Sequence, residues 1–129
     1  MTLLDEVATF IAAGTTLTVG TDLFKGLMPD EPDTCVTIYE SPGRAPVEEM
    51  GANSPVERPN LQVISRSGAY ATARANSQSV WDLLRTVTEQ TLSGKHYLRI
   101  QPFQSPFLMG RDENRRVRIV FNCTVDKEV

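Results

Sequence analysis

Apolar residues recur along this chain with two different periods, and the first of them is helical. The helical period begins near the N-terminus, at Leu3, Leu4, Val7, Phe10 and Ile11. This spacing predicts an amphipathic helix over residues 2–13. Thr2 and Asp5 fit a capping box at its start, and Gly14 is a suitable terminator.

The helical period returns over residues 70–92. Tyr70, Val80 and Leu84 lie on one stripe of such a helix, and Arg85 and Glu89 lie off it as an i,i+4 ion pair. Ser93 and Gly94 would end the helix. A long second helix is therefore predicted here.

Period-two alternation with β-branched and aromatic residues predicts strands. The predicted strands cover residues 34–40, 60–66, 95–101 and 116–125. The β-branched run 15–19 is predicted as a further short strand. After it, Leu23, Phe24 and Leu27 are expected to plug the core from an edge segment.

Two connections are long. Residues 41–59 contain four prolines and two glycines without clear periodicity, and residues 104–115 lead into the last strand. Long connections in a small domain are usually functional or disordered. With 129 residues in all, the chain is predicted to be a single α+β domain over 1–129, with a mainly antiparallel sheet and two helices packed on one face.

The net charge bears on the possible partners. The formal net charge is −3 and the pI about 5.1, which argues against binding nucleic acid or an anionic membrane through bulk charge. Cys35 and Cys123 lack metal-ligand spacing and are predicted to be buried free thiols. The sequence contains no apolar run of membrane-spanning length and no secretory signal, so a cytosolic protein, or one assembled in a cytosol, is expected.

No group of residues forms a catalytic pattern. His96 is the only histidine, and no nucleophile elbow, phosphate loop or paired-histidine motif accompanies it. The acidic run Asp30, Glu31 and Asp33 lacks the spacing of a calcium loop. We therefore expect no catalytic residue, no bound metal and no cofactor.

Charge and apolar residues instead gather before the last strand. Arg111, Arg115, Arg116 and Arg118 surround Asp112 and Glu113. Mixed charge of this kind favours a salt-bridged protein contact over a solvated face or a phosphate site. The apolar group Phe103, Phe107, Leu108 and Met109 either folds back onto the core or forms an exposed binding patch.

Several stretches, in this order, resemble the phage tail terminator proteins, also called minor capsid proteins, of long-tailed bacteriophages. They are Leu3-Leu-Asp-Glu-Val7, Val19-Gly-Thr-Asp-Leu-Phe-Lys-Gly26, Val36-x-Ile-Tyr-Glu40, Leu61-Gln-Val63, Arg66-x-Gly-x-Tyr-x-x-Ala-Arg74 and Gln104-Ser-Pro-Phe-x-x-Gly-Arg-Asp-Glu-Asn114. The resemblance covers nearly the whole chain, and loop 41–59 matches least. It implies a ring-forming subunit, without catalytic residues or cofactor, that ends tail polymerisation.

The resemblance also implies partners: identical subunits in a homo-hexameric ring, the tail tube protein and a head-completion or neck protein. The expected location is the tail or neck of a virion assembled in the host cytoplasm, without a specific nucleic acid or a membrane. Two alternatives stay open: a neck connector that docks on the portal side, and a small enzyme with a site between the sheet and loop 41–59.

A ring uses two different faces of each subunit, and the two long loops are the obvious sources of contact area. The hypothesis places residues 104–116 at a contact with another subunit or the tail tube, where Arg111→Glu with Arg116→Glu would weaken assembly without unfolding the monomer. The candidate interface residues are Arg44, Glu48, Glu49, Arg58, Phe107, Leu108, Met109, Arg111, Asp112, Glu113, Arg116 and Arg118.

Overall fold

A seven-stranded sheet carries two helices in the computed structural model, which describes residues 2–47 and 56–128, without the side chains of 44–47. The elements are α1 (Leu3–Gly14), β1 (Leu23–Lys25), β2 (Cys35–Val47), β3 (Val56–Ser67), α2 (Tyr70–Leu84), β4 (Thr88–Leu92), β5 (Lys95–Pro102), β6 (Phe107–Arg111) and β7 (Val117–Glu128). The predicted α+β class is confirmed.

Strand β7 organises the sheet. Its one edge pairs with β3, while its other edge pairs with β6 near its start and with β5 near its end. The main path is β1-β2-β3-β7-β5-β4, and only the β1–β2 pair is parallel. The sheet is therefore mainly antiparallel, as predicted.

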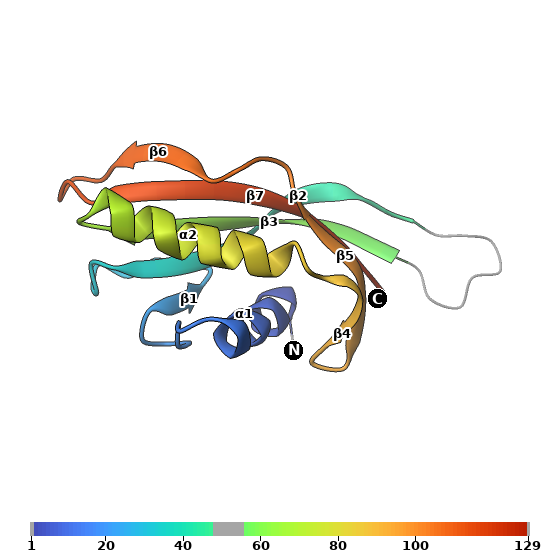
Figure 1. Ribbon diagram of the computed structural model, residues 1–129. Coiled ribbons are helices and arrows are strands. Elements are labelled where there is room, and N and C mark those ends of the chain that lie inside the picture. The colour runs from blue at the N-terminus through green and yellow to red at the C-terminus, as the bar shows by residue number, and fades with distance from the viewer. Residues whose placement is uncertain (1, 48–55, 129) are drawn as a thin grey trace.

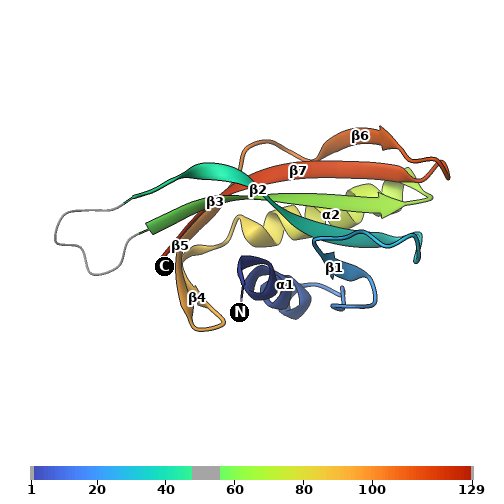
Figure 2. The ribbon, with the colours of Figure 1, turned by 180° about the vertical axis from the view of Figure 1, so that it is seen from behind.

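Both helices lie on the same face of the sheet (Figures 1 and 2). Their buried residues, such as Val7 and Ile11 of α1 and Val80 and Leu84 of α2, form one cluster with inward-facing strand residues such as Phe121. Because successive strand residues point to opposite faces, β7 presents one side of its alternation to the helices. This face is the main hydrophobic core.

Helix α1 begins as the sequence predicts but ends one residue later than predicted, with Gly14 as its last residue and Thr15 as its C-cap. The Thr2 hydroxyl accepts from the Asp5 backbone N–H, and an Asp5 carboxylate oxygen accepts from the Thr2 backbone N–H at 3.0 Å, which confirms the capping box. At the other end, an added Cβ at Gly14 would lie 2.7 Å from a methyl of Leu83. Gly14 therefore allows the end of α1 to approach α2 closely.

A polar group lies inside the core beneath α1. Glu6 is fully buried, and its carboxylate oxygen accepts a hydrogen bond from the Tyr97 hydroxyl at 2.6 Å and from the Lys127 ammonium at 2.8 Å. Burial, followed by the contact with Glu6, raises the pKa of Tyr97 far above its ordinary value. The pairing satisfies groups that would be costly to bury alone.

The second helix is shorter than predicted. It ends at Leu84, and residues 88–92 form β4, which pairs with β5. Ser93 and Gly94, both with positive φ, make the two-residue turn of that hairpin, which is typical of primed turns. The predicted helical pair of Arg85 with Glu89 was wrong: Arg85 stacks on Trp81 at 4.4 Å, and Glu89 contacts His96.

Both long connections contain strands. Residues 41–47 and 56–60 extend β2 and β3 into a hairpin arm beyond the core, and the rest of the predicted loop, 48–55, lies outside the described residues (Figure 1). Residues 107–111 of the second predicted loop are β6. Pairing with a neighbouring strand, which local composition does not reveal, overrode the loop signals.

The segment between α1 and β2 also differs from the prediction. Residues 15–19 form no strand, and within them only Val19 makes an isolated bridge, to Leu23. The strand in this segment is β1, which lies further along the chain than predicted. Leu23 is buried and Phe24 half-buried, as expected, but Leu27 is 75% exposed. The prediction that Leu27 plugs the core was therefore wrong.

Candidate protein interface

Strand β6 is an edge strand with an unusual surface. It pairs with β7, and no other described strand lies along its outer side. Phe107, Leu108 and Met109 follow one another on it, and their exposed fractions are 45%, 55% and 46%. Because neighbouring strand residues point to opposite faces, both faces of β6 are exposed. Phe103, just before β6, is also exposed.

This edge has a bulge between Leu108 and Gly110 but little charge to guard it against pairing with other chains. Edge strands are commonly guarded by charged residues or proline within the strand. In β6, charge appears only at its last residue, Arg111, and Pro106 precedes the strand. The sequence left open whether Phe103, Phe107, Leu108 and Met109 pack on the core or form an exposed patch. In the structure they form an exposed patch.

The segment before β6 is held firmly to the core. The indole N–H of Trp81 donates to the backbone carbonyl of Gln104 at 3.0 Å, and the Phe103 backbone N–H donates to the Asn122 carbonyl at 2.8 Å. These bonds tie both α2 and β7 to residues 103–104. The exposed apolar side chains therefore project from a rigid support.

Arg116 is turned inward, unlike the exposed strand beside it. Its guanidinium donates to Asp112 Oδ2 at 2.7 Å, to Asp30 Oδ1 at 2.9 Å and to Asp33 Oδ1 at 3.2 Å, and its side chain is only 8% exposed. It also donates to the Asp30 carbonyl. Burial opposes the charge, but these hydrogen bonds outweigh it and raise the pKa of Arg116 above its ordinary value.

Arg66 binds the backbone of the segment that contains Asp30 and Asp33. On the face away from the helices, its guanidinium donates to the carbonyls of Pro29, Asp30, Pro32 and Asp33, at distances from 2.7 to 3.2 Å. Together, Arg66 and Arg116 clamp residues 29–33 onto the end of the sheet. The acidic run is thus bound by two arginines, through the carboxylates of Asp30 and Asp33 and through backbone carbonyls.

The arginines that the sequence grouped together have different surroundings in the structure. Arg116 and Asp112 form an ion pair within the subunit, so a substitution of Arg116 would act on the fold as well as on any contact between subunits. Arg111 is exposed and donates to the Arg115 carbonyl at 2.9 Å, and Glu113 is exposed. Arg118 is half-buried, and its Nε has no hydrogen-bond partner among the described residues.

Of the other predicted interface residues, Arg44 and Arg58 belong to the hairpin arm. Arg44 of β2 stands opposite Arg58 of β3 in the strand register, and Arg58 is half-buried. Glu48 and Glu49 lie outside the described residues. The arm residues therefore share one extension, separate from β6, and their role in a contact stays a prediction.

Two further apolar residues are exposed, although the sequence did not predict their exposure. Val19 is 40% exposed beside β1, and Leu27 is exposed just past the end of that strand. Both lie at the sheet edge opposite β6. Val19 and Leu27 each stand in a short apolar stretch that is typical of a buried segment. They are exposed because β1 is an edge strand, which only the structure shows.

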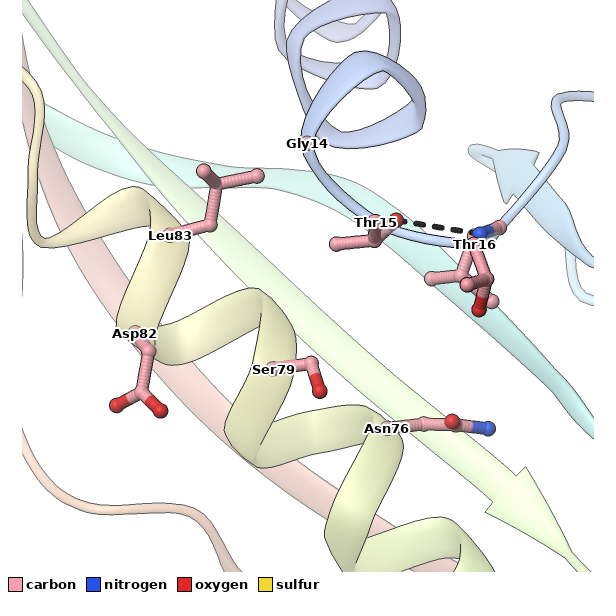
Figure 3. A pocket seen from close by; sticks show the side chains of 8 residues that line it. Gly14, Thr15, Thr16, Asn76, Ser79, Asp82 and Leu83 are labelled. Atoms are coloured by element: carbon pink, nitrogen blue, oxygen red, sulfur yellow. Dashed lines mark hydrogen bonds between the residues drawn. The ribbon is translucent and has the colours of Figure 1, made fainter.

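Two pockets of the described chain carry little reactive chemistry. One, of about 460 Å³, lies between the end of α1 and α2, where Asn76 and Ser79 stand across from the turn of Thr15 and Thr16 (Figure 3). Its lining includes one carboxylate, Asp82, which accepts from Gln78 at 2.9 Å. A second, lined by Arg111, Arg118 and the Arg116 network, contains charges of both signs. Neither pocket pairs a nucleophile with a base.

His96 and the cysteines have structural surroundings. His96 Nε2 lies 2.8 Å from Glu89 Oε2 across the β4–β5 hairpin. Cys35 and Cys123 are buried and free, as predicted, and burial raises the pKa of both thiols, to about 12 for Cys123. In the part of the chain that is described, no three His, Cys, Asp or Glu side chains gather as a metal site. Neither described helix has the length and hydropathy of a membrane span.

Comparison with known proteins places the chain in a virion context. The family model described as bacteriophage tail terminator protein matches residues 10–129. Among solved structures, a chain from the virion of a native gene transfer agent (GTA) particle has the same fold, with a TM-score of 0.59 and 19% identity, over 95% of this chain and 84% of that one. No curated protein matches the sequence. The match over nearly all of its length shows that this chain belongs to the bacteriophage tail terminator family.

Proposed function

We propose that this protein forms a ring that caps the phage tail tube, ends its polymerisation and provides the surface that joins tail to head. Family membership carries the proposal, because it gives the chain a structural role in a phage tail and a place in the virion. The position of the ring at the tail–neck junction and its six-fold symmetry are the further steps that the proposal adds.

The surface of the subunit supports assembly. Rigid, exposed apolar residues on β6 are what a protein contact needs, since a lone soluble monomer rarely keeps such a strand uncovered. The hairpin arm adds a second extension at the far end of the sheet. Ring contacts are heterologous, so each subunit must present two different surfaces.

The proposed partners are identical subunits, the tail tube protein and a head-completion protein. The proposed role is structural, without catalysis or a cofactor. The buried polar groups support this, because Glu6, Tyr97 and Lys127 bind one another and Arg116 binds carboxylates of its own chain. Groups so paired stabilise the fold and are not free to bind a substrate.

The proposal is tested by adding purified protein to tail tubes assembled without a terminator. Electron microscopy should show an annulus at one end of each tube, and tube length should stop increasing when more tube protein is added. Tubes that continue to grow from both ends, with no bound annulus, would contradict the proposal. Binding to portal assemblies but not to tubes would instead support the neck connector.

A further inference from the structure

We infer that the apolar strand β6 of one copy packs against the β1 edge of the next copy, where Val19 and Leu27 are exposed. The inference rests on the proposed ring and names the two surfaces that would form its repeated contact. It concerns the subunit–subunit contact and leaves the surface for the tail tube to other parts of the molecule.

The two surfaces lie on opposite edges of one sheet. Strands β1, β2, β3, β7 and β6 stand side by side in that order, and a strand spacing of about 4.8 Å puts the outer two roughly 19 Å apart. Figures 1 and 2 both show β6 and β1 on opposite sides of β7 and β3. Neither surface can therefore cover the other within one subunit.

The two surfaces hold most of the exposed large apolar side chains of the described chain. Those near β6 are Phe103, Phe107, Leu108 and Met109, those near β1 are Val19 and Leu27, and Tyr70 at the start of α2 is the remaining one. If a single repeated contact buries both edges, it must join unlike edges head to tail. Such contacts close into rings when the rotation between copies allows it.

The remaining edges are less suited to this contact. The outer strand β4 exposes Thr88, Glu89 and Thr91, which are polar or charged. The arm portion of β2 contains Pro42 and Pro46, and proline blunts an edge against strand addition. Apolar complementarity therefore favours the edge at β1.

Packing of side chains, not strand addition, suits the β1 edge. The backbone N–H of Leu23 donates to the Thr18 carbonyl, and its carbonyl accepts from the Gly20 N–H, so its outward backbone groups are already bonded. Both edges also carry charge: Arg111 is exposed at the end of β6, and the β1 edge holds Lys25, which pairs with Asp5, and the half-buried Asp22. A contact of this type would place the apolar groups centrally, with charges at the rim.

The test uses one charge on each edge. Leu108→Asp blocks the β6 surface, and Leu27→Asp blocks the β1 surface, while Thr91→Asp adds the same charge to the exposed outer strand β4 as a control. Because all three side chains are exposed, circular dichroism and thermal melting should match the unsubstituted protein. We expect each leucine variant alone to lose assembly in native mass spectrometry, with association weakened roughly tenfold or more, and Thr91→Asp to retain it.

Mixing the two leucine variants gives the deciding result. The Leu27→Asp copy keeps an intact β6, and the Leu108→Asp copy keeps an intact β1 edge, so the mixture should form mixed dimers and nothing larger. A symmetric contact between two β6 strands predicts instead that Leu27→Asp assembles normally, and that result would overturn the inference. So would normal rings of Leu108→Asp that no longer cap tail tubes, because a tail protein would then cover β6.

Failure of the contact can be told apart from failure of the proposed function. If both leucine variants form rings and cap tubes like the unsubstituted protein, the inferred contact is wrong and the capping function stands. If the unsubstituted protein assembles through these edges but leaves tubes uncapped, the contact stands and the proposed function is wrong.

Discussion

Lys127 and Glu6 form a buried ion pair at 2.8 Å, joining the last strand to the first helix across 121 positions of sequence. Tyr97 lies against both, with its hydroxyl on Glu6 and its ring 5.1 Å from the Lys127 ammonium. The triad joins α1 to the end of β7.

Removing the cation of this triad should strongly destabilise the protein. Lys127→Met leaves the buried Glu6 carboxylate without its counter-ion, and we expect the free energy of unfolding to fall by about 3–5 kcal/mol. Denaturant unfolding measures the change. Lys25→Met, which breaks the exposed pair with Asp5, is the matched control and should cost much less. Equal losses in the two variants would show that the buried pair has no special role.

The clamp on residues 29–33 should depend on Arg116. Arg116→Gln removes the charged hydrogen bonds to Asp30, Asp33 and Asp112, while Arg66 keeps its bonds to backbone carbonyls. Hydrogen exchange should become faster in 29–33 and stay slow in the helices and central strands. Arg115→Gln, at an exposed position, should leave the exchange unchanged. Unchanged protection of 29–33 in Arg116→Gln would contradict the clamp.

Acid should weaken the same clamp. Burial would raise the pKa of Asp112, but the backbone and side-chain hydrogen bonds from Arg116 outweigh it, so its pKa in the folded state lies below the ordinary value. The stabilisation is complete above the unfolded pKa of about 3.9 and is lost as pH falls through the lower folded pKa. Thermal melts between pH 7 and pH 2 should show a smaller acid-induced decrease for Asp112→Asn. A parallel decrease in both proteins would refute the assignment.

The hairpin arm should be sensitive to Gly43. An added Cβ there would collide with the backbone carbonyl of Arg58 and with Pro59, so Gly43→Ala should loosen the pairing of the arm strands. Faster hydrogen exchange in 56–60 would report this, with little change in the core. Gly68→Ala provides the control, because nothing lies within 4 Å of its Cβ position. If Gly43→Ala exchanges like Gly68→Ala, the close approach does not constrain the arm.

Both thiols should be unreactive in the folded protein. Cys35 and Cys123 are fully buried, and burial raises their pKa, so the thiolate fraction near pH 8 is small. An aromatic disulfide reagent should label neither thiol until denaturant is added, and then both. Rapid labelling of either thiol under native conditions would contradict its placement.

Local sequence patterns correctly predicted the elements in which tertiary packing favours the same conformation as the local sequence. The capping box of Thr2 and Asp5, the alternation of β7 and the stripe of Val80 and Leu84 on α2 agree with the final packing, whereas Tyr70, predicted on the same stripe, is exposed. The errors fall where pairing partners decide the conformation. Residues 88–92 continued a helical pattern but joined β5, and residues 107–111 looked like a loop but joined β7.

The candidate site was only partly accessible to sequence reasoning. The pattern identified Phe107, Leu108 and Met109 as a group, but it left open whether they were exposed. It grouped Arg116 with Arg111, although one is buried against Asp30 and Asp112 and the other is exposed. It also assigned Leu27 to the core. Residues that are adjacent in the sequence can have similar side chains and still differ in burial, because burial depends on which distant segment packs against each of them.

The sequence by itself determined the α+β class, the capped first helix, the central strands, the buried thiols and the resemblance to tail terminators, because these depend on local periodicity and on motifs spread in order along the chain. Only the tertiary structure decided that Glu6 meets Lys127, that two arginines hold residues 29–33, and that β6 and β1 are opposite edges with uncovered apolar residues. These features join residues from 33 to 121 positions apart, and no local preference specifies such pairings.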